Sequence, residues 1–376
     1  MSGDSCDVLI VGGGPAGSTC AWQLMKAGLD VLVIDKHTFP RDKVCAGWVT
    51  PAVLESLELD AEDYAQGRVL QPICGFRTGV IGAAAGETHY GRAVSFGIRR
   101  CEFDEYLLRR SGARLRLGEP LRSMVRDGNT WLVNDEIRTP LVIGAGGHFC
   151  PVARTLRGES RGSETIIAAQ EIEFRLPAGE RGACRIAQDV VQIYFCADLK
   201  GYGWCFAKGD YLNVGLGRED SHGLSAHVEQ FRQWLQQSGA IPHDLPGKFN
   251  GHAYLLYPES RRDPVDAGVL LIGDAAGLAY PRSGEGIRPA VESALMAAAV
   301  ILEAAGDYRP ARLAPYVERL TRRFGTKNAQ HDAAPWLPQG LRQSLAAKLL
   351  ATGWFARHVV IDRWFLHAQQ RAVVMG

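Results

Sequence analysis

The amino-acid sequence predicts an α/β fold in which a Rossmann-like lobe is assembled from distant segments and an antiparallel sheet is inserted between them. Apolar runs at residues 7–11, 141–143 and 268–272, each followed by glycine, are typical of buried parallel strands. Residues 163–217 instead alternate apolar and polar side chains between turns, which favours an antiparallel sheet. From about residue 310 the pattern is mostly helical.

The elements of the first lobe follow one another along the chain. A helix over residues 18–27 ends at Gly28, a common helix stop, and a strand over residues 31–34 completes a β-α-β unit. Further helices are expected over residues 102–110 and 290–305, and short strands between residues 115 and 133.

The alternation of the two patterns sets the boundaries of three parts. We assign residues 1–70, 100–158 and 262–305 to the first lobe. Residues 71–99 and 159–261 form the second lobe, and residues 306–376 form a C-terminal helical segment. A ligand is expected between the lobes, because small-molecule sites occur preferentially at domain interfaces.

Composition excludes several classes of function. The 376 residues carry a formal net charge of +1, so no basic field for nucleic acid is expected. The nine cysteines are scattered without a CxxC pair, which indicates reduced thiols in a cytoplasmic compartment and no metal site. The N-terminus lacks the pattern of a signal peptide, and no run approaches the roughly 18 apolar residues of a spanning helix.

The stretch VGGGPAG carries the first functional motif. Gly12 permits a tight turn, Gly14 lets the backbone approach a diphosphate, and Gly17 lets the following helix pack on the strand. Asp35 ends the next strand, at about the spacing from which a carboxylate binds a ribose hydroxyl. The alternative is a glycine turn that serves packing alone. The residues that we expect to contact a dinucleotide here are Gly12, Gly14, Pro15, Ala16, Gly17, Asp35 and Lys36.

Two later motifs identify the dinucleotide as FAD. GDAAG at residues 273–277, followed by glycines before a long helix, resembles the second FAD fingerprint of the flavoprotein superfamily that includes p-hydroxybenzoate hydroxylase. RRCEFDEYL resembles the R-x-x-F-D-x-x-L helix of that superfamily, in which Arg100 would contact FAD. The alternative for Asp274 is a helix cap. The FAD-binding residues implied here are Arg100, Gly273, Asp274, Gly284, Gly286 and Ile287.

Two shorter segments resemble the geranylgeranyl reductase family. FPRDKVCAGWVTP is similar to its K-x-C-G-like segment, and GYGWCFAKGDYLNVGLG is similar to the segment that lines its substrate cavity. The resemblance implies cofactor contacts at Lys43 and Ala46, a catalytic role for Cys45, and substrate contacts at Tyr202, Trp204 and Phe206. Four positions depart from the family pattern. They are Asp35 in place of Glu, Ala46 inserted before Gly47, Gly146 in place of Asp, and Ala207 in place of Pro.

The reaction that the resemblance implies is reduction of a C=C bond in an apolar, isoprenoid-like substrate by hydride from reduced FAD. NADPH or another external donor would supply the electrons. Cys45 would donate a proton or contact the flavin, and the alternative is a small buried apolar side chain. Tyr202 and Trp204 alternate on a predicted strand and would face one side, as a wall for substrate or as ordinary sheet packing.

Two further functions remain open. The first is an FAD-dependent monooxygenase acting on an aromatic or apolar metabolite. Of these, a halogenase is less favoured, because only Trp204 matches the W-x-W-x-I-P stretch of halogenases. The second is a flavin-binding protein without turnover.

The C-terminal stretch at residues 341–368 interleaves Leu, Trp and Phe with Arg and Lys. An amphipathic helix on a membrane surface would explain this pattern and would suit a lipid substrate. We favour a helix packed on the FAD lobe or on a partner subunit. The sequence does not give the oligomeric state.

Overall fold

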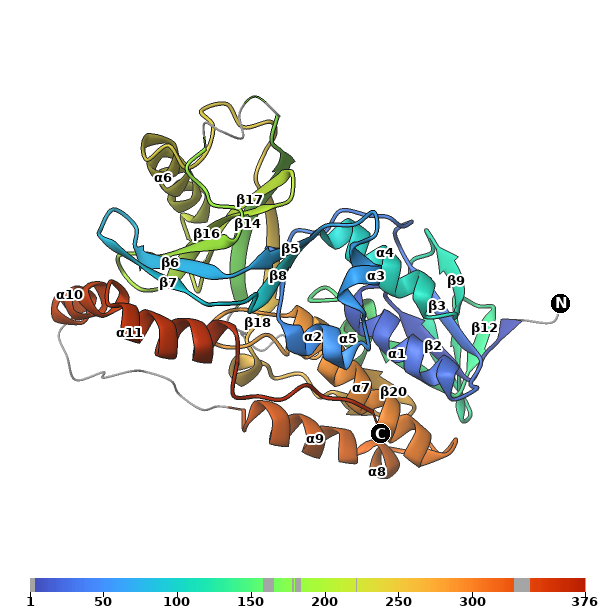
Figure 1. Cartoon of the computed structure of the whole chain (residues 1–376). Coiled ribbons are helices and arrows are strands. Elements are labelled where there is room, and N and C mark those ends of the chain that lie inside the picture. The colour runs from blue at the N-terminus through green and yellow to red at the C-terminus, as the bar shows by residue number, and fades with distance from the viewer. Residues whose placement is uncertain are drawn as a thin grey trace.

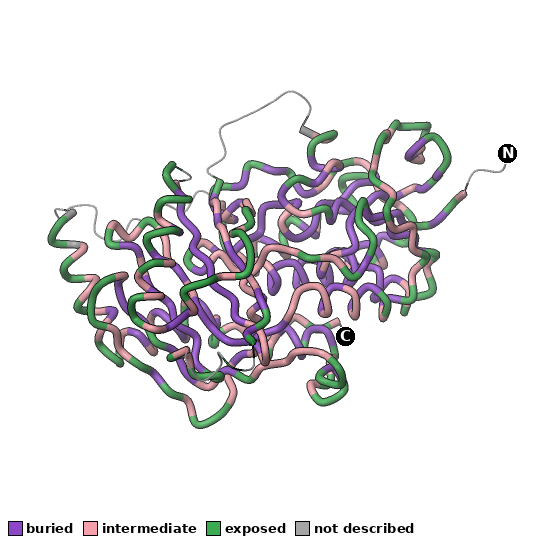
Figure 2. The backbone as a smooth tube through the Cα atoms, turned by 90° about the horizontal axis from the view of Figure 1, so that it is seen from above, coloured by how far each residue is buried: buried purple, intermediate pink, exposed green. Residues whose placement is uncertain are grey.

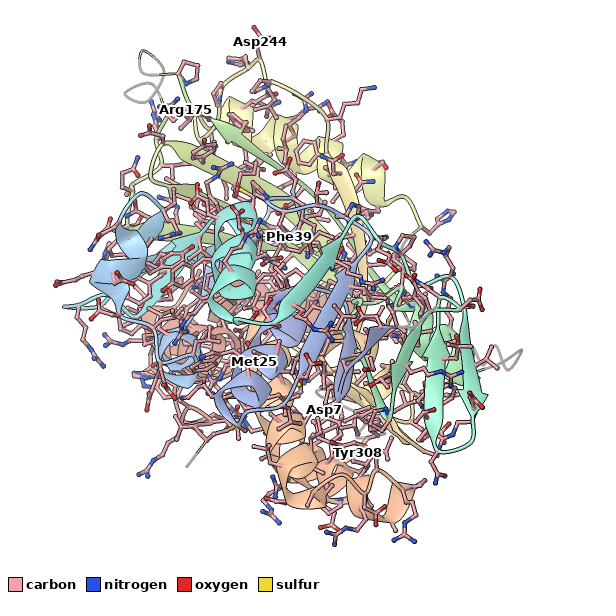
Figure 3. All side chains as sticks on the ribbon, turned by 90° about the vertical axis from the view of Figure 1, so that its right-hand side faces the viewer. Asp7, Met25, Phe39, Arg175, Asp244 and Tyr308 are labelled. Atoms are coloured by element: carbon pink, nitrogen blue, oxygen red, sulfur yellow. The ribbon has the colours of Figure 1, made fainter. Side chains whose placement is uncertain are left out.

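The computed structural model describes residues 4–157, 166–177, 179, 184–220, 222–327 and 339–375. Two lobes lie side by side, each built around a sheet (Figure 1). Figure 3 places Asp7 and Tyr308 on the lobe of the parallel sheet, and Arg175 and Asp244 at the far end of the other lobe. Buried backbone runs through the middle of both lobes, and exposed backbone follows the outer loops (Figure 2).

The first lobe contains a six-stranded sheet drawn from four distant parts of the chain. Its strand order is β19-β20-β13-β2-β3-β9, and all neighbours are parallel except β19 and β20. The strands are β2 Val8–Val11, β3 Val31–Asp35, β9 Arg114–Leu117, β13 Leu141–Gly144, β19 Val265–Asp266 and β20 Val269–Leu271. The four inner strands are buried along their whole length, as both faces of a covered parallel sheet must be.

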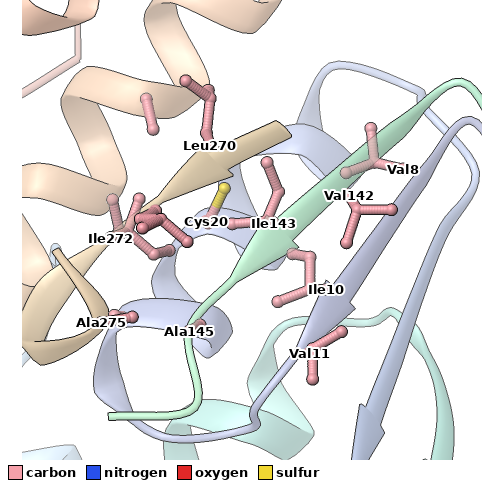
Figure 4. Close-up of a cluster of buried hydrophobic side chains, with 14 of the residues drawn as sticks. Val8, Ile10, Val11, Cys20, Val142, Ile143, Ala145, Leu270, Ile272 and Ala275 are labelled. Carbon is pink, nitrogen blue, oxygen red and sulfur yellow. The ribbon is translucent and has the colours of Figure 1, made fainter. Parts of the chain in front are cut away.

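The centre of this sheet is an apolar core. Val8 and Ile10 from β2 and Ile143 from β13 are fully buried, and Leu270 from β20 and Cys20 from the first helix lie beside them (Figure 4). The predicted parallel strands are therefore confirmed.

Three helices pack in one layer against this sheet. They are α1 Pro15–Lys26, α4 Arg100–Arg110 and α7 Ile287–Ala304, with α1 between the other two. Helix α1 begins at Pro15, three residues before the predicted start at residue 18, because proline suits the first helical position. The long alanine-rich helix likewise begins at Ile287 and not at residue 290.

Two smaller sheets and several short helices lie beside the two large sheets. A four-stranded sheet has the order β1-β12-β11-β10, and a three-stranded sheet has the order β4-β8-β5. Their strands are β1 Asp4–Ser5, β4 Trp48–Val49, β5 Leu70–Ile73, β8 Ser95–Ile98, β10 Met124–Asp127, β11 Thr130–Val133 and β12 Ile137–Thr139. The short helices are α2 Pro51–Ser56, α3 Ala61–Ala65, α5 Pro151–Arg157, η1 Tyr257–Glu259 and η2 Gly273–Ala275.

The second lobe is a seven-stranded sheet with α6 Leu224–Gln237 packed on it. Its order is β18-β14-β17-β16-β15-β6-β7. The strands are β6 Gly75–Val80, β7 Ala85–His89, β14 Ile166–Arg175, β15 Val190–Phe195, β16 Gly201–Lys208, β17 Tyr211–Arg218 and β18 Asn250–Leu255. The sheet is antiparallel as predicted except between β15 and β6, which are parallel. Residues 163–165 of the predicted sheet lie outside the described residues.

The C-terminal part is helical, as predicted, and it packs on the second lobe more than on the FAD lobe that we favoured. The helices are α8 Pro310–Leu313, α9 Pro315–Phe324, α10 Gln339–Leu350, α11 Gly353–Phe355 and the π-helix η3 Ala356–Phe365. The stretch from α10 to η3 packs mainly against β6 and β7 of the second lobe, and Phe365 of η3 also stacks on Trp48 of the first lobe. The reason is an apolar cluster in which Leu350, Val360 and Phe365 bury against Phe76 and Ile193. Among the described residues, no helix combines the length and apolarity needed to cross a membrane.

A buried ion triad joins α7 to α9 and to the chain after η3. Glu292 is fully buried and accepts hydrogen bonds from Arg288 Nε at 2.8 Å and from Arg323 Nε at 2.8 Å. The guanidinium of Arg288 also donates to the Gln370 carbonyl at 2.6 Å, and Arg323 donates to the Arg371 carbonyl at 3.0 Å. The triad therefore holds the C-terminal tail against the first lobe.

Replacing Glu292 with alanine should destabilise the fold by about 3–5 kcal/mol, because it leaves two guanidinium groups without their buried anion. Urea unfolding of both proteins measures this difference. The control is Glu303→Ala on the same helix, whose exposed ion pair with Arg319 should contribute only about 0–1 kcal/mol. Equal losses for the two variants would contradict a structural role for the triad.

Candidate functional site

One cavity of about 580 Å³ is lined by both lobes. Its walls come from the glycine turn, the loop after β3, α4, β16, β18, the start of α7 and η3. All but two of the site residues predicted from the sequence line it. The exceptions are Gly17 and Gly273.

The glycine turn forms one end of the cavity. Gly12 has φ +117°, and a Cβ there would lie 2.5 Å from the Ala145 carbonyl oxygen. A Cβ at Gly17 would lie 1.9 Å from the Gly12 carbonyl oxygen, so this glycine serves helix packing. A Cβ at Gly14 would meet only the tip of Arg41, at 3.4 Å, so this backbone faces the cavity. The turn and the N-terminus of α1 thus offer N–H groups to an anionic ligand.

Asp35 fixes this turn from the end of β3. Its Oδ2 accepts a hydrogen bond from the Gly13 N–H at 2.8 Å, and its Oδ1 accepts one from the His37 N–H at 2.9 Å. The side chain is mostly buried but faces the cavity. Because a carboxylate has about four acceptor positions, it can still accept from a ribose hydroxyl.

Asp104 holds two cations at the cavity wall. It is fully buried and accepts two hydrogen bonds from Arg100, at 2.7 and 2.8 Å, and lies 3.2 Å from Arg41 Nη2. Burial by itself would lower the pKa of the Arg100 guanidinium, but the Asp104 carboxylate raises it above its usual value. Both arginines line the cavity as fixed positive charges.

Lys43, His252 and Asp274 form a row across the cavity. Lys43 Nζ lies 3.0 Å from His252 Nδ1, and His252 Nε2 lies 4.0 Å from Asp274 Oδ2. Burial, followed by the charges of Lys43 and Arg100, holds the pKa of His252 well below its usual range. Burial and Arg100 also lower the pKa of Lys43. His252 is therefore neutral at pH 7, and its ring nitrogens serve as hydrogen-bonding groups.

A buried polar network fixes the loop that carries Cys45. The Cys45 N–H donates to Glu171 Oε1 at 2.6 Å, and Asn213 donates to Glu171 Oε2 at 3.2 Å. Lys208 is fully buried, pairs with Glu173 and donates to the Ala46 carbonyl at 2.9 Å. Burial raises the pKa of Glu171. Side chains of β14, β16 and β17 therefore hold the loop in place.

The other end of the cavity is aromatic. Tyr202, Trp204 and Phe206 alternate along β16 and face the cavity, where Phe365 of η3 and Trp48 of β4 join them. Ring centroids lie 5.2 Å apart for Tyr202 and Phe365 and 5.5 Å apart for Trp48 and Phe365. The Trp204 Nε1–H donates to Asn213 Oδ1 at 2.7 Å, and the Tyr202 hydroxyl donates to the Ser283 carbonyl. Because these polar atoms already have partners, the wall that they form suits an apolar ligand.

Gly146 departs from the pattern of many hydroxylases for a visible reason. A Cβ at this position would lie 3.2 Å from the Cys150 Cα and 3.3 Å from Pro151 Cδ. The turn after β13 is therefore tight at this position, and an aspartate there would need Cys150 and Pro151 to shift by a few tenths of an ångström.

Sequence reasoning missed several residues that line the cavity. They are Arg41, Trp48, Glu171, His252, Glu285 and Phe365. Glu285 stands between two glycines of a quoted motif, and its charge there was an available signal. Arg41 and Trp48 stand in the quoted segment FPRDKVCAGWVTP, which was a signal for them as well. Glu171, His252 and Phe365 had none, because distant packing alone brings them to the cavity.

The residues present fit FAD. One end offers a glycine turn, a helix N-terminus, Asp35 and two fixed arginines, which match an adenine dinucleotide. The cavity then continues past Asp274 and the N-terminus of α7 toward the aromatic wall. Such a helix N-terminus suits the polar edge of a flavin ring.

The comparisons agree with this fit. Residues 7–98 match the family model described as FAD dependent oxidoreductase. The menaquinone reductase of Mycobacterium tuberculosis is 31% identical over 320 residues, which cover 79% of this chain and 77% of the relative. A digeranylgeranylglycerophospholipid reductase of Methanosphaera stadtmanae is 27% identical, over 87% of this chain and 85% of the relative.

Solved structures share the fold. A geranylgeranyl bacteriochlorophyll reductase-like protein from Thermoplasma acidophilum superimposes with a TM-score of 0.75 at 23% identity, over 99% of this chain and 94% of that chain. A halogenase in complex with FAD superimposes with a TM-score of 0.67 at 17% identity, over 85% of this chain and 74% of that chain. The predicted Rossmann-like fold with an inserted sheet is therefore confirmed, and so is FAD as the cofactor. The chain belongs to the geranylgeranyl reductase family of FAD-dependent oxidoreductases.

Proposed function

We propose that this enzyme reduces C=C bonds in an isoprenoid chain, with the reacting part of the substrate held against the aromatic wall. The observation that carries the proposal is the continuity of one cavity from a nucleotide end to an apolar end. The names of the relatives, among them a geranylgeranyl diphosphate reductase of Rhodobacter capsulatus, support a polyprenyl substrate.

The cofactor contacts are part of the proposal. The glycine turn would bind the diphosphate, Asp35 the ribose, and Asp274 the ribityl chain. Arg100 and Lys43 would offset the phosphate charge. When bound and reduced, FAD supplies a hydride. An external donor, NADPH or another reductant, would then reduce the FAD again.

The chain's own residues would then bind and orient the substrate. Tyr202, Trp204 and Phe206 supply a rigid apolar wall, and Phe365 closes it from the other side. Such a wall excludes water from the reacting carbons and limits the poses of a flexible chain. Cys45 stands on the cavity wall, where its thiol would contact the cofactor ring or the substrate.

The division into lobes is proposed on the same basis. Residues 1–70, 100–158 and 262–305 would hold FAD, and residues 71–99 and 159–261 would hold the substrate. Phe365 extends the substrate part to the C-terminal segment of residues 306–376.

We also propose that α10 and α11 contact a membrane surface, where a polyprenyl substrate would reside. Leu341, Leu345 and Trp354 expose 56%, 47% and 70% of their surface, beside the exposed Lys348. Exposed Trp and Leu next to cations are typical of interfacial segments.

Reduced, FAD-loaded enzyme mixed anaerobically with geranylgeranyl diphosphate should be reoxidised, and the product should gain a pair of hydrogen atoms. Flavin absorbance and product mass measure the two halves of the reaction. A fully saturated analogue should leave the flavin reduced. A requirement for O₂, with its oxygen atom in the product, would overturn the reductase in favour of a monooxygenase. No reaction under either condition would favour a binding protein without turnover.

Arg100→Ala should weaken FAD binding about tenfold to a hundredfold, or roughly 1.4–2.8 kcal/mol, because it removes a fixed charge from the cavity wall. Quenching of flavin fluorescence on titration measures the affinity. The control is Arg99→Ala. Arg99 is the neighbouring residue, and it pairs with Glu102 and Glu173 and does not line the cavity. Equal FAD affinities for the two variants would show that Arg100 does not contribute to FAD binding.

Trp354→Ala should lower binding to vesicles of mixed neutral and anionic lipids severalfold, because an exposed indole is lost from the interface. Cosedimentation measures the bound fraction. The control is Val125→Ala, because Val125 is an exposed apolar residue on the four-stranded sheet. Trp22 on α1 would not serve, because it is buried. Vesicle binding that is absent in the parent, or unchanged by the substitution, would overturn the membrane contact.

A further inference from the structure

The carboxamide of Asn213 lies fully buried between the aromatic wall and the loop of Cys45. Its Oδ1 accepts a hydrogen bond from the Trp204 Nε1–H at 2.7 Å. Its Nδ2 donates to Glu171 Oε2 at 3.2 Å and to Glu173 Oε2 at 3.3 Å, and lies 3.5 Å from the Cys45 carbonyl oxygen. Asn213 does not line the cavity itself, so any effect on a ligand passes through the groups that it binds.

The hydrogen bonds of Asn213 are fixed in direction. An indole N–H donates and does not accept, so the carboxamide oxygen must face Trp204. The NH₂ group then faces the two acids of β14, which accept from it. The other carboxyl oxygen of Glu171 accepts from the Cys45 N–H at 2.6 Å. A chain of three hydrogen bonds therefore runs from the indole of the wall to the backbone of the loop.

A second route joins Asn213 to the same loop through Lys208. This lysine is fully buried and pairs with Glu173, the other acid that Asn213 binds. Its ammonium also donates to the Ala46 carbonyl at 2.9 Å and to the Ile98 carbonyl at 3.0 Å. Two anchors of the loop backbone thus lead to acids that one carboxamide binds.

The position of the Trp204 indole depends on β17. Gly215 lies directly opposite Trp204 on this strand, and a Cβ at Gly215 would lie 2.2 Å from Trp204 Cζ2. The indole therefore lies against the strand backbone, with its N–H held by Asn213. Tyr202, the neighbouring member of the wall, is tied elsewhere, because its hydroxyl donates to the Ser283 carbonyl. Trp204 is thus the residue through which the wall meets Asn213.

We propose that Asn213 is a positioning residue that fixes the indole of Trp204 and the loop of Cys45 relative to each other. The assignment rests on the proposed function, in which the indole holds the substrate and the thiol contacts the cofactor ring or the substrate. Moving either group would leave polar atoms of a buried carboxamide or carboxyl unpaired, which costs free energy. The two groups therefore keep one relative position, and a change at the wall reaches the loop through Asn213.

Alkylation of the Cys45 thiol by iodoacetamide tests how firmly the loop is held, on the full chain with and without bound FAD. Asn213→Leu should raise the rate at Cys45 about tenfold, because the lost hydrogen bonds had opposed local opening of the loop. Peptide mass spectrometry measures this rate and, in the same sample, the rates at Cys20 and Cys205. These two thiols are fully buried, so they should stay at the parent's rate unless the whole chain unfolds.

The wall side of the chain of hydrogen bonds has its own variant. Trp204→Phe keeps an aromatic ring, loses the N–H and should raise the rate at Cys45 severalfold. Tyr202→Phe on the same strand is the control and should label as the parent does, because its hydroxyl bonds elsewhere. In Asn213→Leu the further change Trp204→Phe should add nothing.

A parent-like rate at Cys45 in a folded Asn213→Leu would overturn the assignment. Equal rates in Trp204→Phe and Tyr202→Phe, or a Trp204→Phe effect that persists without Asn213, would do the same. Should Asn213→Leu unfold, with the buried thiols labelled together with Cys45, the comparison of the two wall variants decides.

Turnover separates the assignment from the proposed function. In anaerobic reoxidation by geranylgeranyl diphosphate, a folded Asn213→Leu should show a lower maximal rate and a higher half-saturating substrate concentration than the parent. The first follows from the displaced loop and the second from the displaced wall. Parent-like values of both would contradict the positioning role. An inactive parent would overturn the proposed function, and the alkylation rates would still show whether Asn213 holds the loop.

Discussion

The pairing of Arg288 with Glu292 is the interaction on which much of the site depends. It sets the buried charge of Arg288 against that of Glu292, close to the turn of Glu285 at the start of α7. The remaining donors of Arg288 bind carbonyls of the C-terminal tail, which carries His367. The same tail follows η3, whose Phe365 closes the aromatic wall. One buried ion pair thus connects the end of the chain, the start of α7 and the apolar part of the cavity.

The two ends of the cavity use polar groups in opposite ways. At the nucleotide end, backbone N–H groups of the glycine turn and two arginines face the ligand. At the aromatic end, the polar atoms of Tyr202 and Trp204 are bound to protein acceptors. Burying an unpaired polar atom costs free energy, so this pairing leaves a wall that an apolar chain can cover. The nucleotide end of the cavity is therefore polar, and the other end is apolar.

The second lobe contributes rigidity as well as a wall. Glu171 and Glu173 lie on β14, Asn213 lies on β17 and Lys208 lies on β16, and together they hold the loop of Cys45. A network of this kind is stable only when its members are satisfied. Because the loop belongs to the chain after β3, these contacts also join the two lobes at the site.

The sequence by itself determined the parallel sheet, the FAD motifs, the alternation of Tyr202, Trp204 and Phe206, and the helical C-terminus. Each of these is a local pattern, set by strand and helix periodicity or by glycines at fixed spacing. The tertiary structure decided the rest. His252, Glu171 and Phe365 come from segments with no motif, and Asp104, which pairs with Arg100 within α4, gains its second cation where Arg41 meets that helix. It also decided that α10 to η3 cover the second lobe and that burial raises the pKa of Glu285. Burial and charge compensation arise between residues far apart in sequence, and no local pattern encodes them.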